Sequence, residues 1–245
     1  MAGQESTYVS FVRTSLVSSI LPLAVLGGLS GLLLVDRTES IGVWLLEENH
    51  PVELLSSLGA LLAAVVSFTV LRRPHVTSGL ARGFFVVFGA AMFFLAMEEI
   101  SWGQQFLDFS TPEPWRARNR QDELTLHNYD FRGVEFLEIY PLTFAIGGLV
   151  GVVLGATNVL PQEISPPVWM WPWFGVIAAH SGVDLLHEFV IPSTRLDDLV
   201  NDLDEASEML VAFSALTFVI AKRRPTLAHR SEPSRGRRAL GISRR

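Results

Sequence analysis

Two adjacent carboxylates end a long apolar segment of this sequence. Apolar residues run almost unbroken from Phe84 to Met97, and Glu98 and Glu99 follow directly. Carboxylates in such a position can bind a metal ion, or one of them can accept a proton from a metal-bound water. We therefore expect Glu99 to be a metal ligand and Glu98 to be a general base, with Ser101 as a second catalytic residue.

A second polar group lies in the stretch HSGVDLLHE. His180, Asp184, His187 and Glu188 follow the spacing i, i+4, i+7 and i+8, so on a helix they share one face over about two turns. Imidazole nitrogens and carboxylate oxygens are typical ligands of zinc, iron or manganese. A hydrogen-bonded stripe at the membrane interface is the simpler interpretation, but polar groups in a membrane are costly and usually face a cavity or each other. The pattern therefore favours His180, Asp184 and His187 as ligands of a divalent metal.

Three more positions extend the expected site. Glu205 and Glu208 form a second carboxylate pair at the spacing i, i+3, and we expect Glu208 to be a ligand. Acids in the first turn of a helix also favour the helix dipole, which is the alternative reading of this pair. His127, in the long connection 101–134, is the last expected ligand. For Glu98 and Glu99, the alternative is a helix end in the headgroup region, anchored by Trp102.

The connection 101–134 is longer than a membrane hairpin needs, and loops of this length are often functional. Its arginines and amides suit an anionic or lipid headgroup, and the alternative is an amphipathic segment on the membrane surface. The candidate substrate-binding residues are Arg116, Arg118, Arg120, Asn119, Gln121, Glu123 and Asn128.

The composition indicates a membrane protein. Of the 245 residues, 49% are hydrophobic and 18% charged, where soluble domains carry about 25% charged residues. Cysteine is absent, which excludes disulfides, thiolate metal sites and a cysteine nucleophile. Neither a phosphate-binding loop nor a G-x-S-x-G elbow occurs, so nucleotide and α/β-hydrolase chemistry have no support.

Six apolar segments are long enough to cross the hydrocarbon core as helices, which takes about 18 residues. They cover residues 15–35, 52–71, 80–100, 136–160, 168–191 and 205–221. The first is too long for a signal peptide and is read as a retained span. The predicted fold is therefore all-α: a single six-helix membrane bundle over residues 1–222, followed by a basic tail, 223–245, for which we expect disorder.

The distribution of Lys and Arg predicts the orientation. From Lys222 onward the chain holds nine of its 19 basic residues and one of its 25 acids, and Arg72 and Arg73 lie between the second and third spans. Cytoplasmic flanks are rich in Lys and Arg, so we expect both termini in the cytoplasm and the protein in the cell's inner (plasma) membrane. Arginines in the connection 101–134 argue weakly for the opposite orientation. With the termini inside, the acids and histidines at the span ends lie on the extracytoplasmic side.

Two resemblances add to this reading. EEISWGQQ, followed by the pattern N-x-Q-x-E-x-x-L-H-N from Asn119, resembles a family of multi-pass bacterial membrane proteins of unknown function. The likeness covers the third span and the loop after it, and it implies no particular activity. A fainter one is to the alkaline ceramidase superfamily, membrane hydrolases that hold zinc with three histidines. It would imply zinc at His127, His180 and His187, but this chain lacks that superfamily's H-x-x-x-H pair.

Three functions remain open from the sequence. The first is a metal-dependent hydrolase or transferase acting on a lipid or lipid-linked substrate, with membrane lipids as partners and no nucleic acid. The second is an ion- or proton-coupled transporter, and the third is a non-enzymatic assembly protein whose polar groups tie helices together. A transporter needs polar residues along a complete path, and the cytoplasmic halves of the spans offer few, so a closed site is favoured.

Overall fold

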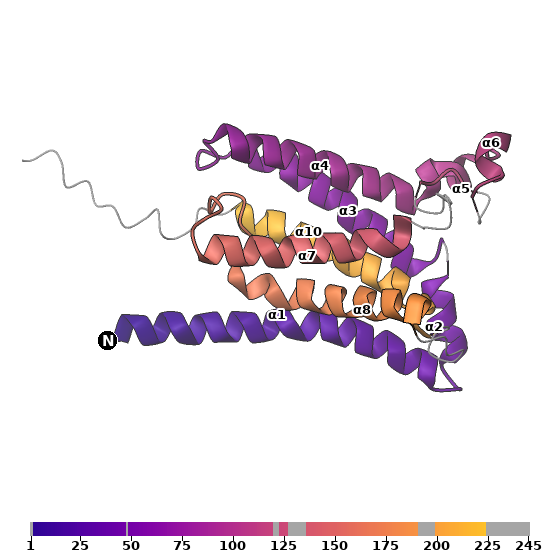
Figure 1. Ribbon diagram of the computed structural model, residues 1–245, viewed down its shortest axis with the longest axis horizontal. Helices are drawn as coiled ribbons and strands as arrows, with labels where there is room; N and C mark the ends of the chain where they lie inside the picture. Colours follow the sequence, from indigo (N-terminus) through magenta and orange to yellow (C-terminus); the bar gives the residue numbers. More distant parts are fainter. Residues whose placement is uncertain (1, 48, 120–122, 127–135, 191–198, 224–245) are drawn as a thin grey trace, which may run out of the picture.

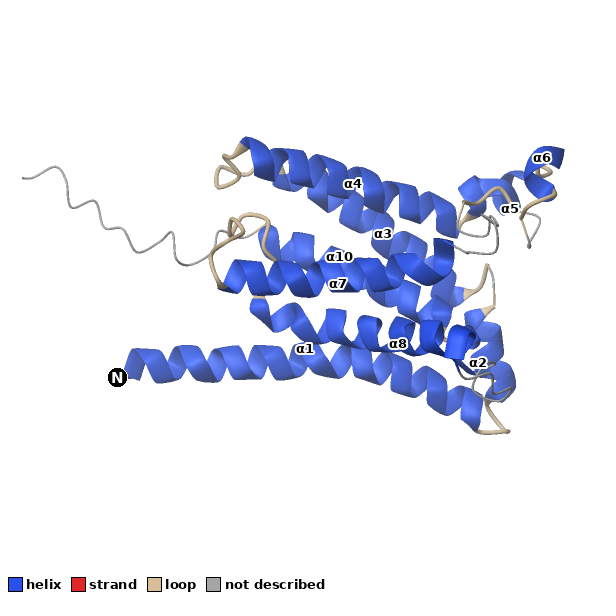
Figure 2. Ribbon diagram, viewed as in Figure 1, coloured by secondary structure: helices blue, strands red, loops and turns tan. Residues whose placement is uncertain are grey.

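The computed structural model describes residues 2–47, 49–119, 123–126, 136–190 and 199–223, and for 2–17, 105, 136–138 and 187–190 it gives the backbone alone. Over these ranges the chain consists of helices and loops, with no strand (Figure 2). The predicted all-α fold class is confirmed.

Each predicted span coincides with a long helix of the described chain. These helices are α1 (Ala2–Leu34), α3 (Pro51–Val70), α4 (Gly79–Glu99), α7 (Phe136–Ala156), α8 (Trp171–Val190) and α10 (Asp204–Lys222). Shorter elements connect them: α2 (Glu39–Leu46), η1 (Ser101–Gly103), α5 (Gln104–Leu107), α6 (Glu113–Arg116) and η2 (Val168–Met170).

Within the described residues, three segments are long and apolar enough to cross a membrane. They are Glu39–Val70, which contains α2 and α3, Gly79–Glu99 and Ile139–Ala156. A shorter apolar stretch covers Ser18–Leu34 in α1. Large apolar side chains point outward from these helices, with Val87 69% and Val153 60% exposed. Apolar surface of this extent is unusual for a protein in water and indicates a membrane protein.

Helix α10 occupies the centre of the bundle. Every residue from Ala206 to Ala212 is buried, and its largest contact is with α3, which in turn packs against α4. Small residues permit the close approach: a Cβ added to Gly59 would lie 3.3 Å from the Cβ of Ala212. In Figure 1, α10 lies behind α7, and α7 packs along α8.

The bundle has two chemically different ends. The N-terminus and the last turn of α10 lie at the left in Figure 1, and the end of α4 and the start of α10 lie at the right. We call the left end the basic end; its polar residues include Arg72, His75, Ser78, Gln162, Glu163 and Lys222. We call the right end the acidic end; its polar residues are Glu53, Glu98, Glu99, Tyr140, His180, Asp204, Glu205 and Glu208.

Side chains at the basic end hold neighbouring elements together. His75 Nε2 donates to the carbonyl oxygen of Lys222 at 2.9 Å, and Lys222 Nζ donates to the carbonyl oxygen of Gln162 at 2.6 Å. Ser78 caps α4 by accepting from the Ala81 amide, and its hydroxyl donates to Glu163 Oε2 at 2.7 Å. These bonds join the turn between α3 and α4 to the loop after α7 and to the end of α10.

Candidate functional site

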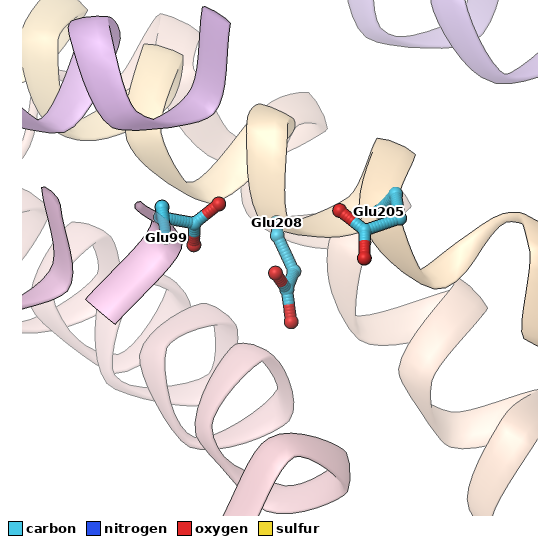
Figure 3. A group of neighbouring side chains, drawn as sticks. All are labelled: Glu99, Glu205 and Glu208. Carbon is cyan, nitrogen blue, oxygen red and sulfur yellow. The ribbon is translucent and has the colours of Figure 1, made fainter. Parts of the chain in front are cut away.

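Three glutamates meet at the acidic end. Glu99 is the last residue of α4, while Glu205 and Glu208 lie in the first two turns of α10 on the same side of the helix. One carboxylate oxygen from each lies within 4.8 Å of the others. In Figure 3, Glu99 and Glu205 extend from opposite sides towards Glu208. We call these three residues the carboxylate cluster.

Two members of the carboxylate cluster are buried, and each has one oxygen without a hydrogen bond. Glu99 is 3% exposed and Glu208 5%. Glu99 Oε2 and Glu208 Oε1 accept no hydrogen bond, and no basic side chain of the described residues pairs with either glutamate. The buried hydroxyl of Tyr140, in α7, also lacks a partner. Three carboxylates so close in a low-dielectric environment need a bound cation or protons to neutralise them.

The atoms of the cluster limit which cation fits. The group holds carboxylate oxygens and no imidazole. Oxygen-only sites favour magnesium, calcium or manganese over zinc. Of the metals expected from the sequence, namely zinc, iron and manganese, manganese suits this set best.

His180 and Asp184 do not belong to the described cluster. His180 Nδ1 lies 3.9 Å from Asp204 Oδ1, which is too long for a hydrogen bond, and neither ring nitrogen has a hydrogen-bond partner. Because Asp204 is one turn before Glu208 in α10, His180 lies next to the cluster without joining it. The structure thus unites Glu99 and Glu208 among the predicted ligands, while His127 and the side chain of His187 lie outside the described residues.

Glu98 holds the loop after α4, and this changes the role expected of it. Its Oε1 accepts from Trp102 Nε1 at 2.6 Å, and its Oε2 accepts from the Leu126 amide at 2.5 Å. Both oxygens are therefore occupied, and the residue is 3% exposed. In this arrangement Glu98 is an anchor for the loop rather than a free proton acceptor.

The motif residues that follow also bind the loop to itself. Gln104 donates to Thr111 Oγ1 at 2.9 Å and accepts from the Leu124 amide at 2.8 Å. Asn119 donates to the Thr125 carbonyl at 3.2 Å and accepts from the Glu123 amide at 3.2 Å. Of the amides expected to bind substrate, only Asn119 lies in the described loop, and there its side chain bonds within the loop.

The other predicted headgroup-binding residues are exposed or fall outside the described chain. Arg116 and Arg118 are exposed, and Arg116 Nη1 lies 3.8 Å from Glu113 in a surface pair. Glu123 is buried, with 4% of its surface exposed. Arg120, Gln121 and Asn128 lie outside the described residues.

The chain turns left-handed just after the two acids. Ser101, Trp102 and Gly103 have φ values of 47°, 55° and 81°. Left-handed backbone costs a non-glycine residue about 1–2 kcal/mol, and such strain is concentrated at functional sites. The turn returns the indole of Trp102 to Glu98 and buries Ser101, which is 1% exposed.

A cavity of about 510 Å³ lies beside the cluster. Its walls come from α4, α7 and α10, and Leu126 of the loop covers one end. Glu98, Glu99, Tyr140 and Glu208 are among its lining residues, so the cluster borders a largely apolar space of a size that ligands occupy.

Two residues of this site were missed from the sequence as site residues. Glu205 is expected from the sequence only as the pair partner of Glu208 and not as a ligand, and no expectation concerns Tyr140. The signal that could have found them is their depth in the membrane, because the predicted topology places the start of α7, the end of α4 and the start of α10 at the same end of the bundle.

No family model matches this chain, and neither does any curated protein or solved structure.

Proposed function

We propose that this protein is a membrane enzyme whose carboxylate cluster binds a hard divalent cation, and that it acts as a hydrolase or transferase on a lipid or lipid-linked substrate. The observation that carries the proposal is the approach of Glu99, Glu205 and Glu208 within 4.8 Å, with two buried carboxylate oxygens left without a partner. A cation bound there would polarise a substrate oxygen or activate a water.

The proposed placement has six membrane-crossing helices, both termini in the cytoplasm of a cell with an inner (plasma) membrane, and the cluster in the extracytoplasmic leaflet. Arg72, Arg73, Lys222 and Arg223 lie at the end of the bundle that also holds the N-terminus, which supports this orientation. The neighbours of α10 cover it, so its acids need not face hydrocarbon. Reporter fusions after Arg73 and after the C-terminus should both report cytoplasm; a periplasmic signal from either one contradicts this placement.

An apolar plug below the site supports an enzyme over a transporter. Phe84, Phe85, Phe88 and Phe218 pack together, with 5.5 Å between the ring centroids of Phe88 and Phe218. The buried hydroxyl of Ser67, at the same depth, donates to the Phe85 carbonyl and is not available to an ion. A transporter needs polar groups along a continuous path, whereas these residues close the bundle beneath the cluster.

His180 replaces Glu98 as the proposed proton acceptor. Both of its ring nitrogens lack hydrogen bonds, and Asp204, 3.9 Å away, can orient and stabilise a protonated imidazole. Glu98 positions the loop that covers the site. Glu99, Glu205 and Glu208 supply the metal ligands in this assignment.

Metal binding by the purified, full-length protein in detergent tests the proposal. After treatment with EDTA, the protein is titrated with Mn²⁺, and free Mn²⁺ is measured by electron paramagnetic resonance. We expect stoichiometric binding that Glu208→Gln abolishes, because an amide is a poor ligand for a hard cation. Glu163→Gln, at the basic end, is the matched control and should bind as the wild type does.

Two results would overturn the proposal. If the wild type binds none of Mn²⁺, Mg²⁺ and Ca²⁺, the cluster is not a cation site. If it binds zinc instead, and His180→Asn removes that zinc while Glu208→Gln does not, the histidines form the metal site.

A further inference from the structure

The residues that line the cavity beside the cluster are polar at one end, whereas the surface that faces the cavity is almost entirely apolar. The same order occurs in three helices, each of which has a polar residue at the acidic end and an apolar residue about one turn further in. These pairs are Glu99 and Leu95 in α4, Tyr140 and Phe144 in α7, and Glu208 and Val211 in α10. Such a cavity matches an amphiphile, with its polar head at the cluster and its hydrocarbon below it.

The cavity opens sideways, towards the surface that a bilayer would cover. Helix α4 packs on α3 and α7 packs on α8, whereas α4 and α7 have little contact with each other in the described chain. Residues of both helices line the cavity together with residues of α10. Ala91 and Phe94 line the cavity and are also exposed on the outer surface of α4. The opening is therefore at a depth where the surroundings are hydrocarbon chains.

The chemistry of the walls selects the occupant. Water needs about 2–4 polar partners to remain in a cavity, and Leu95, Phe144 and Val211 offer none. The volume of about 510 Å³ is within the range of about 300–1,000 Å³ for ligand pockets. A hydrocarbon chain fits both the walls and the opening.

We propose that this cavity binds one acyl chain of a bilayer lipid, which enters between α4 and α7 and places the lipid's polar head at the carboxylate cluster. The inference rests on the proposed function for the role of that lipid as substrate, and it names the substrate class as an acyl-chain lipid. Val211 then forms the inner wall of the cavity against the acyl chain, and Ala91 and Phe94 flank the entrance.

Photolabelling in a membrane tests this proposal. The full-length protein is reconstituted into phosphatidylcholine vesicles in which a small fraction of the lipid carries a diazirine in one acyl chain. After photolysis, mass spectrometry locates the labelled residues. Val211 is only 1% exposed, whereas Val87, on the outer surface of α4, is 69% exposed. Bulk lipid reaches Val87, but only a lipid inside the cavity reaches Val211, so we expect both to be labelled.

Adjacent alanines of α4 provide a matched pair of variants. Ala90 and Ala91 are both exposed, but only Ala91 lines the cavity. Ala91→Trp should fill the entrance and remove most of the label from Val211 while leaving Val87 labelled; Ala90→Trp should change neither. If Ala91→Trp does not fold, the milder Leu95→Phe serves the same purpose.

Three outcomes would overturn the proposal. One is labelling of Val87 without Val211 in the wild type, and another is equal loss of Val211 labelling in both alanine variants. The third is labelling of Val211 by a free diazirine fatty acid but not by the phospholipid, which would exclude a bilayer lipid.

The experiment separates this proposal from the proposed metal site. Labelling is performed in EDTA, so it does not depend on a bound cation. If the wild type is labelled at Val211 but binds no cation, the lipid cavity is supported and the metal-dependent function is refuted. If it binds a cation but is not labelled at Val211, the metal site is supported and the lipid cavity is refuted.

Discussion

The two ends of this helix bundle differ in how fully their polar side chains are hydrogen-bonded. At the basic end, His75, Ser78 and Lys222 each donate a hydrogen bond to a neighbouring element. At the acidic end, Glu99, Tyr140 and Glu208 have buried oxygen atoms without any hydrogen bond. An unpaired buried polar group costs about 1–3 kcal/mol, so several at one place oppose folding unless a ligand binds them.

This difference is the one expected between an end that only holds helices together and the end proposed here to bind a ligand. Polar side chains that only hold helices together are expected to satisfy each other, as they do between α3, α4 and α10 at the basic end. The acidic end instead has glutamates with unpaired oxygens, which lie next to a largely apolar cavity and a left-handed turn of the backbone. The same comparison yields four predictions, given from the largest expected effect to the smallest.

The largest effect concerns stabilisation by metal. A ligand at 100 times its Kd stabilises the folded state by about 2.7 kcal/mol, or a rise in Tm of roughly 5–11 °C for a protein of this size. We expect Mn²⁺ to produce such a rise in the wild type and in Glu163→Gln, but not in Glu208→Gln. Thermal unfolding in detergent, with and without EDTA, measures it. Equal rises in all three proteins would mean that the two ends do not differ in metal binding.

Glu98→Gln should loosen the loop that covers the acidic end. The amide retains one acceptor oxygen, so either the Trp102 indole or the Leu126 amide loses its partner, at a cost of about 1–3 kcal/mol. Limited proteolysis between Gly103 and Leu126 should become faster. Glu113→Gln is the control in the same loop, because Glu113 has 85% of its side chain exposed; equal cleavage of both variants would remove the anchor role of Glu98.

Removing one hydroxyl from each end should give unequal losses of stability. Ser67 Oγ donates to the Phe85 carbonyl at 2.8 Å, near the basic end, and Ser67→Ala should lower the free energy of unfolding by about 0.5–1.5 kcal/mol. The Tyr140 hydroxyl has no partner, so Tyr140→Phe should cost less. Denaturant or thermal unfolding of the two variants in EDTA provides the measurement. A larger loss in Tyr140→Phe would show that its hydroxyl is bonded in the folded protein.

The smallest effect is a pH dependence at the basic end. The Ser78 hydroxyl, which donates to Glu163, holds the pKa of that carboxyl below its usual 4.5. Because the pKa of Glu163 is lower in the folded state than its ordinary value of 4.5, its ionised form stabilises the folded state above pH 4.5. This stabilisation is lost as the pH falls from 4.5 through the lower pKa of the folded state. Glu163 is only half-buried, so solvent screening keeps the contribution small. Tm measured from pH 7 to pH 3 should show a slightly larger advantage of the wild type over Glu163→Gln at the upper end; a difference that is constant with pH would contradict this.

The fold was largely predictable because apolar length determines the long helices. The segment expected at 205–221 is the helix Asp204–Lys222, and the one at 52–71 is Pro51–Val70. The span expected to reach residue 160 ends at Ala156, because Asn158 adopts a φ of 58° and the Gln162 amide bonds to the Gly155 carbonyl. Helix α2 was not predicted, since its eight residues are too few to register as a span.

The site was predictable only in part, because sequence spacing relates residues on one helix and not residues on different helices. The i, i+3 spacing placed Glu205 and Glu208 together, but their meeting with Glu99 depends on α3, which packs against both α10 and α4. The spacing of His180, Asp184 and His187 on one face of α8 predicted a metal site with histidine ligands, whereas the described cluster consists of carboxylates. The hydrogen bond between Glu98 and the Leu126 amide joins residues 28 positions apart, so no local spacing in the sequence could have predicted it.

The central position of α10 has a consequence for how the protein is made. Helix α10 contacts α1, α3, α7 and α8, and all four are synthesised before it. Until it emerges from the ribosome, the core lacks its central helix, and Glu99 has neither Glu205 nor Glu208 beside it. The order of translation therefore delays assembly of the acidic site until the last of these helices enters the membrane, so that insertion of α10 completes the core and the site in the same step.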